Sequence, residues 1–224
     1  TQGEEMQRDY WYSNARHPGE LLSAQAIGRK AGERSVARLG ARKMATQQAP
    51  VLFVPELARG LFSHFIGAIS GGAIYRKSSF LLDKLGQPVF SPRVTLTQKP
   101  FIPRGAGSSA YDSEGVATHE RVLVDAGVLQ GWLLGSYSAR KLGLETTGNA
   151  GGVFNLVAQT GKKGFDELLR DMGTGLVVTE LMGQGVNNVT GDYSRGAAGY
   201  WVENGALAYP VQELTIAGNL LDMF

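Results

Sequence analysis

Apolar and polar positions are spaced differently in the two parts of the chain. Before residue 88, apolar residues recur every three or four positions in residues 18–40 and 55–69. This spacing places them on one face of a helix, which has about 3.6 residues per turn. After residue 88, short alternating runs separated by glycines predict strands instead.

The first part is expected to contain a strand and a helix before its main domain begins. Residues 4–12 end in aromatic side chains and predict the strand. The helix should begin at Pro18 and end at Gly40, because proline suits a first turn and glycine suits the position after the last one. A polar stretch follows and marks a boundary. We expect residues 1–45 to end a preceding domain and residues 46–224 to form the main one.

A second strand runs directly into a second helix. Residues 51–54 are apolar, and Pro55 suits the first helical turn because its missing N–H would have no partner within the helix. Residues 70–72, Ser-Gly-Gly, are expected to break this helix. Residues 78–86 begin with Ser and end near Gly, which predicts a further short helix.

Turn chemistry predicts two hairpins in the second part. Residues 120–136 should turn at Asp125-Ala126-Gly127, and residues 197–211 at Asn204-Gly205. Further strands are expected at residues 93–98, 175–181 and 211–218, and short helices at residues 137–144 and 164–173. The class is therefore α+β, with short helices followed by a mainly antiparallel, strand-rich sandwich or irregular barrel.

Composition narrows the function classes. The 224 residues are 43% hydrophobic and 19% charged with a net charge of +2, so direct nucleic-acid binding is not indicated. No apolar run reaches the roughly 20 residues of a membrane span. The absence of Cys excludes disulfides, thiolate nucleophiles and Cys-based zinc sites within these residues, and it fits a reducing compartment. The 31 glycines are about twice the usual share, which suggests tight turns and close backbone contacts.

The chain carries few patterns typical of a catalytic site. His119-Glu120 has Leu123 where a helical HExxH zinc motif needs its second His. No G-x-S-x-G elbow is present, and the Gly/Ser stretch at residues 105–115 lacks the lysine and helix of a phosphate loop. The carboxylates do not form an evident acid–base pair.

The polar, glycine-rich tract at residues 182–201 allows two interpretations. It could be a barrel corner or strand bulge, or an edge that pairs with another chain or a peptide strand. The candidate substrate- or partner-binding residues in it are Gly183, Gly185, Asn187, Asn188, Asp192, Arg195 and Gly196.

Several segments resemble one known family. Residues 172–220, together with residues 75–87, 111–116 and 132–144, are similar to the C-terminal half of PmbA/TldE-type chains of the TldD/PmbA family, whose members have been labelled modulators of DNA gyrase. The resemblance implies that an N-terminal half and a short C-terminal tail are missing here. It also implies that residues 46–224 are the family's C-terminal domain.

The resemblance further implies a two-subunit peptidase of the bacterial cytoplasm. Its TldD-type subunit carries an HExxxH helix whose histidines hold zinc, with the Glu as base and a further Cys ligand from the tail. The PmbA/TldE-type subunit shares the fold, lacks the ligands and pairs with TldD around a cavity. The pair is associated with maturation of a microcin precursor and degradation of an unfolded antitoxin.

The family motif can be placed on this chain through the glycine-leucine pair at residues 60–61. Its His, Glu and His then fall on Val54, Pro55 and Arg59, none of which can bind zinc or act as the base. We therefore expect no catalytic residue and no cofactor in this chain, and zinc in the TldD-type partner. The glycine-rich strands near residues 183–205 and the helix from Pro55 are the expected interface or cavity wall.

Two alternatives to this non-catalytic subunit remain. The chain could be a stand-alone binding or chaperone-like modulator, or an independent hydrolase whose metal or nucleophile has not been identified. The isolated chain could also pair with itself, because the family fold does so.

Overall fold

The computed structural model describes residues 3–224, which form two compact units. Several chain segments contribute to each unit. The first unit contains the residues up to Arg59, Lys162–Gln184 and Ser194–Ile216, and the second contains Gly60–Gly161, Gly185–Tyr193 and Ala217–Phe224.

The first unit is built on a four-stranded sheet with the order β1-β6-β7-β8. Strand β1 (Val51–Phe53) runs parallel to β6 (Gly175–Met182), and β7 (Asp192–Glu203) is antiparallel to β6. Strand β8 (Ala206–Asn219) follows β7 directly. The ends of β7 and β8 that meet the loop at residues 185–191 are counted with the second unit.

Both faces of this sheet carry apolar clusters, because neighbouring residues of a strand point to opposite sides. Leu176 and Val178 belong to one cluster, together with Trp201 of β7. Val177, between them in sequence, belongs to the other. That second cluster also receives Leu169 from helix α5, which spans Phe165–Met172.

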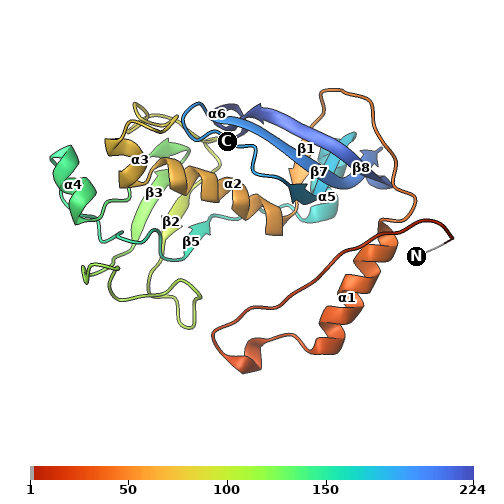
Figure 1. Cartoon of the computed structure of the whole chain (residues 1–224), viewed down its shortest axis with the longest axis horizontal. Coiled ribbons are helices and arrows are strands. Elements are labelled where there is room, and N and C mark those ends of the chain that lie inside the picture. The colour runs from red at the N-terminus through yellow and green to blue at the C-terminus, as the bar shows by residue number, and fades with distance from the viewer. Residues whose placement is uncertain (1–2) are drawn as a thin grey trace. The chain divides into compact units, whose positions relative to one another are not determined.

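The N-terminal residues differ from the predicted strand. Residues 4–12 form no strand and run beside helix α1 (Ala24–Ala37), as Figure 1 shows. Asp9 accepts a hydrogen bond from Arg34 at 3.1 Å and lies 3.6 Å from Arg38. Charged side chains thus hold this segment in place, without a backbone ladder. The helix also starts later than predicted, because Ser23 caps it and Pro18 begins only a short 3-10 turn, η1 (Pro18–Glu20).

The second unit contains a four-stranded antiparallel sheet with the order β4-β3-β2-β5. Its strands are β2 (Leu96–Gln98), β3 (Arg121–Asp125), β4 (Val128–Leu129) and β5 (Leu156–Ala158). Helix α2 (Pro55–Ala68) begins in the first unit and continues into the second from Gly60. Its residues Phe65 and Ala68 share the core of the second unit with Leu96 and Leu123, so the end of α2 covers this sheet (Figure 1).

Three short helices complete the second unit. Helix α3 (Gly71–Tyr75) is capped by Ser70, α4 (Ser136–Leu142) ends at Gly143, and α6 (Leu220–Met223) is capped by Asn219.

The Ser-Gly-Gly at residues 70–72 breaks the helix as predicted, because α2 ends at Ala68 and Ser70 caps the next helix, α3. Two further predictions at this level were wrong. The predicted helix at residues 78–86 is a series of turns, in which the Ser79 hydroxyl accepts a hydrogen bond from the Leu81 N–H. Residues 211–218 are the second half of the long strand β8 and not a separate strand.

The predicted class is confirmed. The fold is α+β with short helices and mainly antiparallel strands, and neither sheet closes into a barrel. Both predicted hairpin turns form: Ala126-Gly127 and Asn204-Gly205 each have two consecutive positive φ angles. Within residues 3–224, no helix has the length and apolar character needed to cross a membrane.

Candidate functional site

The three motif positions lie where β1 passes into α2. Pro55 is the first residue of α2, as predicted, and the Val54 carbonyl accepts hydrogen bonds from Leu57 and Ala58 at 2.9 Å each. The Val54 side chain packs against the apolar cluster on one face of the first sheet. Arg59 is exposed and donates a hydrogen bond to the Tyr12 hydroxyl. These side chains offer no oxygen, sulfur or imidazole nitrogen to a metal.

The seven residues predicted to bind a substrate or partner are divided between the two units. Gly183, Arg195 and Gly196 belong to the first, where Gly196 of β7 pairs with Met182 of β6. Strand β7 lies between β6 and β8, so residues 194–203 do not form the free edge that one interpretation of this tract required.

The other four residues belong to the second unit, where Gly185, Asn187 and Asn188 lie in the loop before β7 and Asp192 is the first residue of that strand. Asn187 accepts hydrogen bonds from Val189 and Gly191, the Asn188 carbonyl accepts one from Phe80, and the Asp192 carboxylate accepts one from Thr190. These contacts fix the shape of the loop, while Gly185 is exposed beside them. A binding role for all seven residues stays a prediction.

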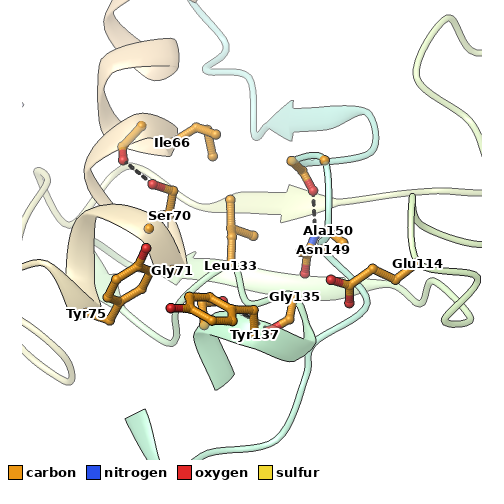
Figure 2. A pocket seen from close by; sticks show the side chains of 15 residues that line it. Ile66, Ser70, Gly71, Tyr75, Glu114, Leu133, Gly135, Tyr137, Asn149 and Ala150 are labelled. Atoms are coloured by element: carbon orange, nitrogen blue, oxygen red, sulfur yellow. Dashed lines mark hydrogen bonds between the residues drawn. The ribbon is translucent and has the colours of Figure 1, made fainter. Parts of the chain in front are cut away.

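The second unit contains a hollow that the sequence did not predict. Its volume is about 450 Å³, within the usual range for sites that hold a small ligand or a side chain. Four separate stretches surround it, as Figure 2 shows: the end of α2 with α3, the loop that carries Glu114, residues 133–138 at the start of α4, and the loop after residue 148. The residues that line it include Gly71, Tyr75, Glu114, Gly135, Tyr137 and Asn149.

A buried polar network holds the loop at residues 148–152. The Asn149 amide donates to Gln98 Oε1 at 2.7 Å and to the Gly152 carbonyl at 2.8 Å. Arg121 donates to Asn149 Oδ1 at 2.8 Å and to the Trp132 carbonyl at 3.2 Å. Gln98 is fully buried and Asn149 is 4% exposed, so their hydrogen bonds replace those that water would have made. The network gives the hollow a fixed wall.

Two carboxylates tie the loop at residues 111–116 to this wall. Asp112 is 4% exposed and accepts hydrogen bonds from the backbone N–H groups of Glu114, Val116 and Ala150 at 2.9–3.0 Å. Burial alone would raise the pKa of Asp112, but these three hydrogen bonds outweigh it and lower the pKa.

Glu114 reaches the start of helix α4. Its Oε2 accepts a hydrogen bond from the Ser136 N–H at 2.7 Å. The Ser136 hydroxyl and then its N–H lower the pKa of Glu114, so the carboxylate is charged at neutral pH. The sequence suggested a plain loop at residues 105–115, and only the structure shows that this loop caps a helix 22 residues away.

Close packing of small residues brings α3 and α4 together. A Cβ added to Gly71 would lie 2.2 Å from Ser138 Oγ, which is too close for any other residue type. The rings of Tyr75 and Tyr137 meet edge to face, with centroids 5.6 Å apart. The helices therefore present two aromatic rings on one side of the hollow.

The described residues do not form an evident catalytic constellation. In residues 3–224, no group of three or more His, Cys, Asp or Glu side chains is arranged to hold a metal ion. The hollow combines one carboxylate, two tyrosines and backbone groups, which suits binding of a ligand better than bond cleavage.

The comparison with known proteins identifies the family of this chain. Residues 46–224 match the family model described as PmbA/TldA metallopeptidase C-terminal domain. The chain belongs to this family. A boundary between domains at residue 45 stays a prediction.

The chain is similar to named PmbA-type members of the PmbA/TldA family. It is 52% identical to "Metalloprotease PmbA" of Escherichia coli O157:H7 over 98% of this chain and 49% of that protein. It is 50% identical to "Metalloprotease PmbA homolog" of Haemophilus influenzae over 97% of this chain and 49% of that protein. The same organism has a "Metalloprotease TldD homolog", 28% identical over 66% of this chain and 33% of that protein. The chain thus spans about half the length of the curated PmbA-type relatives that it matches.

A solved structure has the same fold. The crystal structure described as "putative modulator of DNA gyrase" from Bacteroides thetaiotaomicron is 36% identical, with a TM-score of 0.92. The match covers 99% of this chain and 50% of that one.

The residues at the three predicted motif positions do not fit the metal that the family name implies. Val54 and Pro55 have no donor atom in their side chains, and the Arg59 guanidinium carries a positive charge that would repel zinc. The disagreement lies in the chemistry of these side chains, since α2 itself begins at Pro55 as predicted.

Proposed function

We propose that this chain belongs to a non-catalytic subunit of a heterodimeric zinc metalloprotease that acts on unfolded peptides in the cytoplasm. Its partner would be a TldD-type subunit that holds the zinc and the catalytic base. One observation carries the proposal: a chain of a metallopeptidase family has Val54, Pro55 and Arg59 at the positions where the resemblance would place the ligands and base of the motif. Such a chain can bind and position a substrate, but it cannot activate water through that motif.

Two further observations support the pairing. Haemophilus influenzae has both a PmbA-type and a TldD-type relative of this chain, as a two-subunit enzyme would require. The hollow of the second unit offers a preformed surface for part of a peptide. The microcin precursor and the unfolded antitoxin of the family are the substrates we expect to be tested first.

The test is co-expression of the full-length protein with a TldD-type chain from the same organism. We expect a 1:1 complex in size-exclusion chromatography with light scattering, with zinc in the complex and almost none in the full-length protein alone. Glu56→Gln in this subunit should leave peptidase activity unchanged, because Glu56 lies beside the base position without metal ligands around it. The matched Glu→Gln change in the motif of the TldD-type chain should abolish activity.

Other outcomes would contradict the proposal. One zinc ion bound tightly by the isolated full-length protein would point to an independent hydrolase. A stable monomer or homodimer that never associates with a TldD-type chain would favour a stand-alone binding or chaperone-like modulator.

A further inference from the structure

The hollow of the second unit is lined by one negative charge and two aromatic rings. Glu114 is the one charged side chain among the described residues that line it, and Tyr75 and Tyr137 supply the rings. In the view of Figure 2, Glu114 lies at one end and Tyr75 at the other. We propose that this hollow binds a primary ammonium group of a peptide, with Glu114 as the counter-ion. This inference rests on the proposed function, because it names the part of a peptide substrate that this subunit would hold.

Ser136 holds the Glu114 carboxylate in place. Its N–H donates to Oε2 at 2.7 Å and its hydroxyl also hydrogen-bonds the carboxylate, whose two oxygens can together accept about four hydrogen bonds. Oε1 lies on the side of Gly135, where an added Cβ would come within 3.4 Å of it. Because Gly135 lines the hollow and has no side chain, Oε1 can be reached from the hollow. A single oxygen suits the point contact of an ammonium better than the two-point contact of a guanidinium.

The two tyrosine rings favour a cation nearby. Arg76 lies 5.1 Å from the centroid of the Tyr75 ring, and Lys141 lies 5.6 Å from that of Tyr137. Each ring therefore already attracts a cation of this chain through its π-electron face. Neither Arg76 nor Lys141 is among the lining residues, so the hollow itself is not occupied by their charges.

The surrounding charges decide where in the hollow the ammonium should lie. Arg76 is close to Gly72, at the α3 end, and would repel a second cation there. Arg140 attracts Glu114 from α4. The Asp112 carboxylate, next to Glu114 in the same loop, adds negative potential at that end. We therefore place the ammonium at the Glu114 end, away from Arg76.

A peptide can present a primary ammonium in two ways, at its amino terminus or on a lysine side chain. The experiment uses the full-length protein and three peptides of equal length, each with a fluorescent label at its carboxyl end. The first has a free amino terminus and no lysine, the second is acetylated with one lysine, and the third is acetylated without lysine. Fluorescence anisotropy gives the dissociation constant of each.

We expect the third peptide to bind about five-fold more weakly than the peptide with the preferred ammonium, the size typical of an exposed ion pair next to an aromatic ring. Glu114→Gln should make all three peptides equal, because it removes the charge and keeps an oxygen for the Ser136 N–H. Glu120→Gln is the matched control, since Glu120 is exposed and lies outside the hollow. Which of the first two peptides binds better identifies the source of the ammonium.

Equal binding of the three peptides by the unmodified protein would overturn the proposal, as would a preference that persists in Glu114→Gln or no binding of any peptide. The complex with the TldD-type chain is tested separately with the same variants. A complex that forms and cleaves all three peptides equally would keep the proposed function and refute the ammonium site. A preference that depends on Glu114 without any complex would support the site and refute the proposed function.

Discussion

Replacing Asp112 by Asn should release the loop at residues 148–152 and leave the loop at residues 113–116 in place. Asp112 Oδ1 accepts hydrogen bonds from Glu114 and Val116, and Oδ2 accepts one from Ala150. The oxygen of Asn should remain where it accepts two bonds, so its NH₂ group would face the Ala150 N–H. Two buried donors would then meet without an acceptor, which costs about 1–3 kcal/mol. Asp112→Ala removes all three acceptor contacts and should cost more.

Hydrogen exchange measured by mass spectrometry on the full-length protein can separate these effects. In Asp112→Asn, amides of residues 148–152 should exchange roughly ten-fold faster or more, because about 1.4 kcal/mol is a factor of ten. Amides of residues 113–116 should change little, whereas Asp112→Ala should release both segments. Asp83→Asn, at an exposed position, is the control. Unchanged protection of residues 148–152 in Asp112→Asn would refute this account of the loop.

The same carboxylate gives a prediction for pH. The pKa of Asp112 is lowered from its ordinary value of 3.8 in the folded protein. Because the pKa is lower in the folded protein, the carboxylate contributes its full stabilisation at pH values above its ordinary pKa. This stabilisation is lost as the pH falls through the pKa of the folded protein. The free energy of unfolding should therefore differ between the unmodified protein and Asp112→Asn by a constant amount from about pH 7 to about pH 5. This difference should shrink below about pH 4.

Two further predictions concern positions where the packing is most restrictive. Gly199→Ala should lower the melting temperature and soluble yield sharply, since the new Cβ would lie 1.9 Å from the Val177 carbonyl oxygen. Gly196→Ala should be tolerated, because its new Cβ would come no closer than 3.5 Å to a neighbouring atom, the Met182 Cβ. Equal melting temperatures for the two variants would contradict this. Arg121→Met should destabilise the second unit by about 1–3 kcal/mol, because Asn149 Oδ1 loses its charged donor and keeps only the Thr147 hydroxyl. Faster hydrogen exchange in residues 148–152 would measure this loss.

Local turn chemistry explains why much of the fold could be predicted. The turns at Ala126-Gly127 and Asn204-Gly205 need residues that adopt positive φ, and a proline at residue 55 suits a helix start. Each of these signals lies within a few residues of the structure it specifies. The failure at residues 4–12 has the opposite cause. Their place is set by ion pairs to α1, more than 20 residues away, and the aromatic pattern contains no sign of those pairs.

The hollow could not be predicted, because distant segments build it. Gly71 of α3 donates a backbone hydrogen bond to Leu133 at 2.8 Å, and Leu133 donates one to Ile69 at 3.0 Å. The Leu134 N–H then bonds to the Thr147 hydroxyl at 2.8 Å, which brings the loop at residues 148–152 alongside. Each segment alone has the composition of an ordinary loop or short helix. Their chemistry becomes visible only when these long-range contacts place Glu114 beside Gly135.

The two ends of helix α2 are subject to different physical constraints, so the helix can keep its place in the fold with or without a metal site at its start. Phe65 and Ala68 are fully buried in the core of the second unit, so the later turns of the helix are needed for folding. Pro55 and Arg59 are exposed, so other residues could occupy these positions without any change in the core. Val54 differs, because its side chain packs on an apolar cluster. A histidine at residue 54 would place a polar imidazole against that cluster, so the packing of the first sheet favours an apolar residue there.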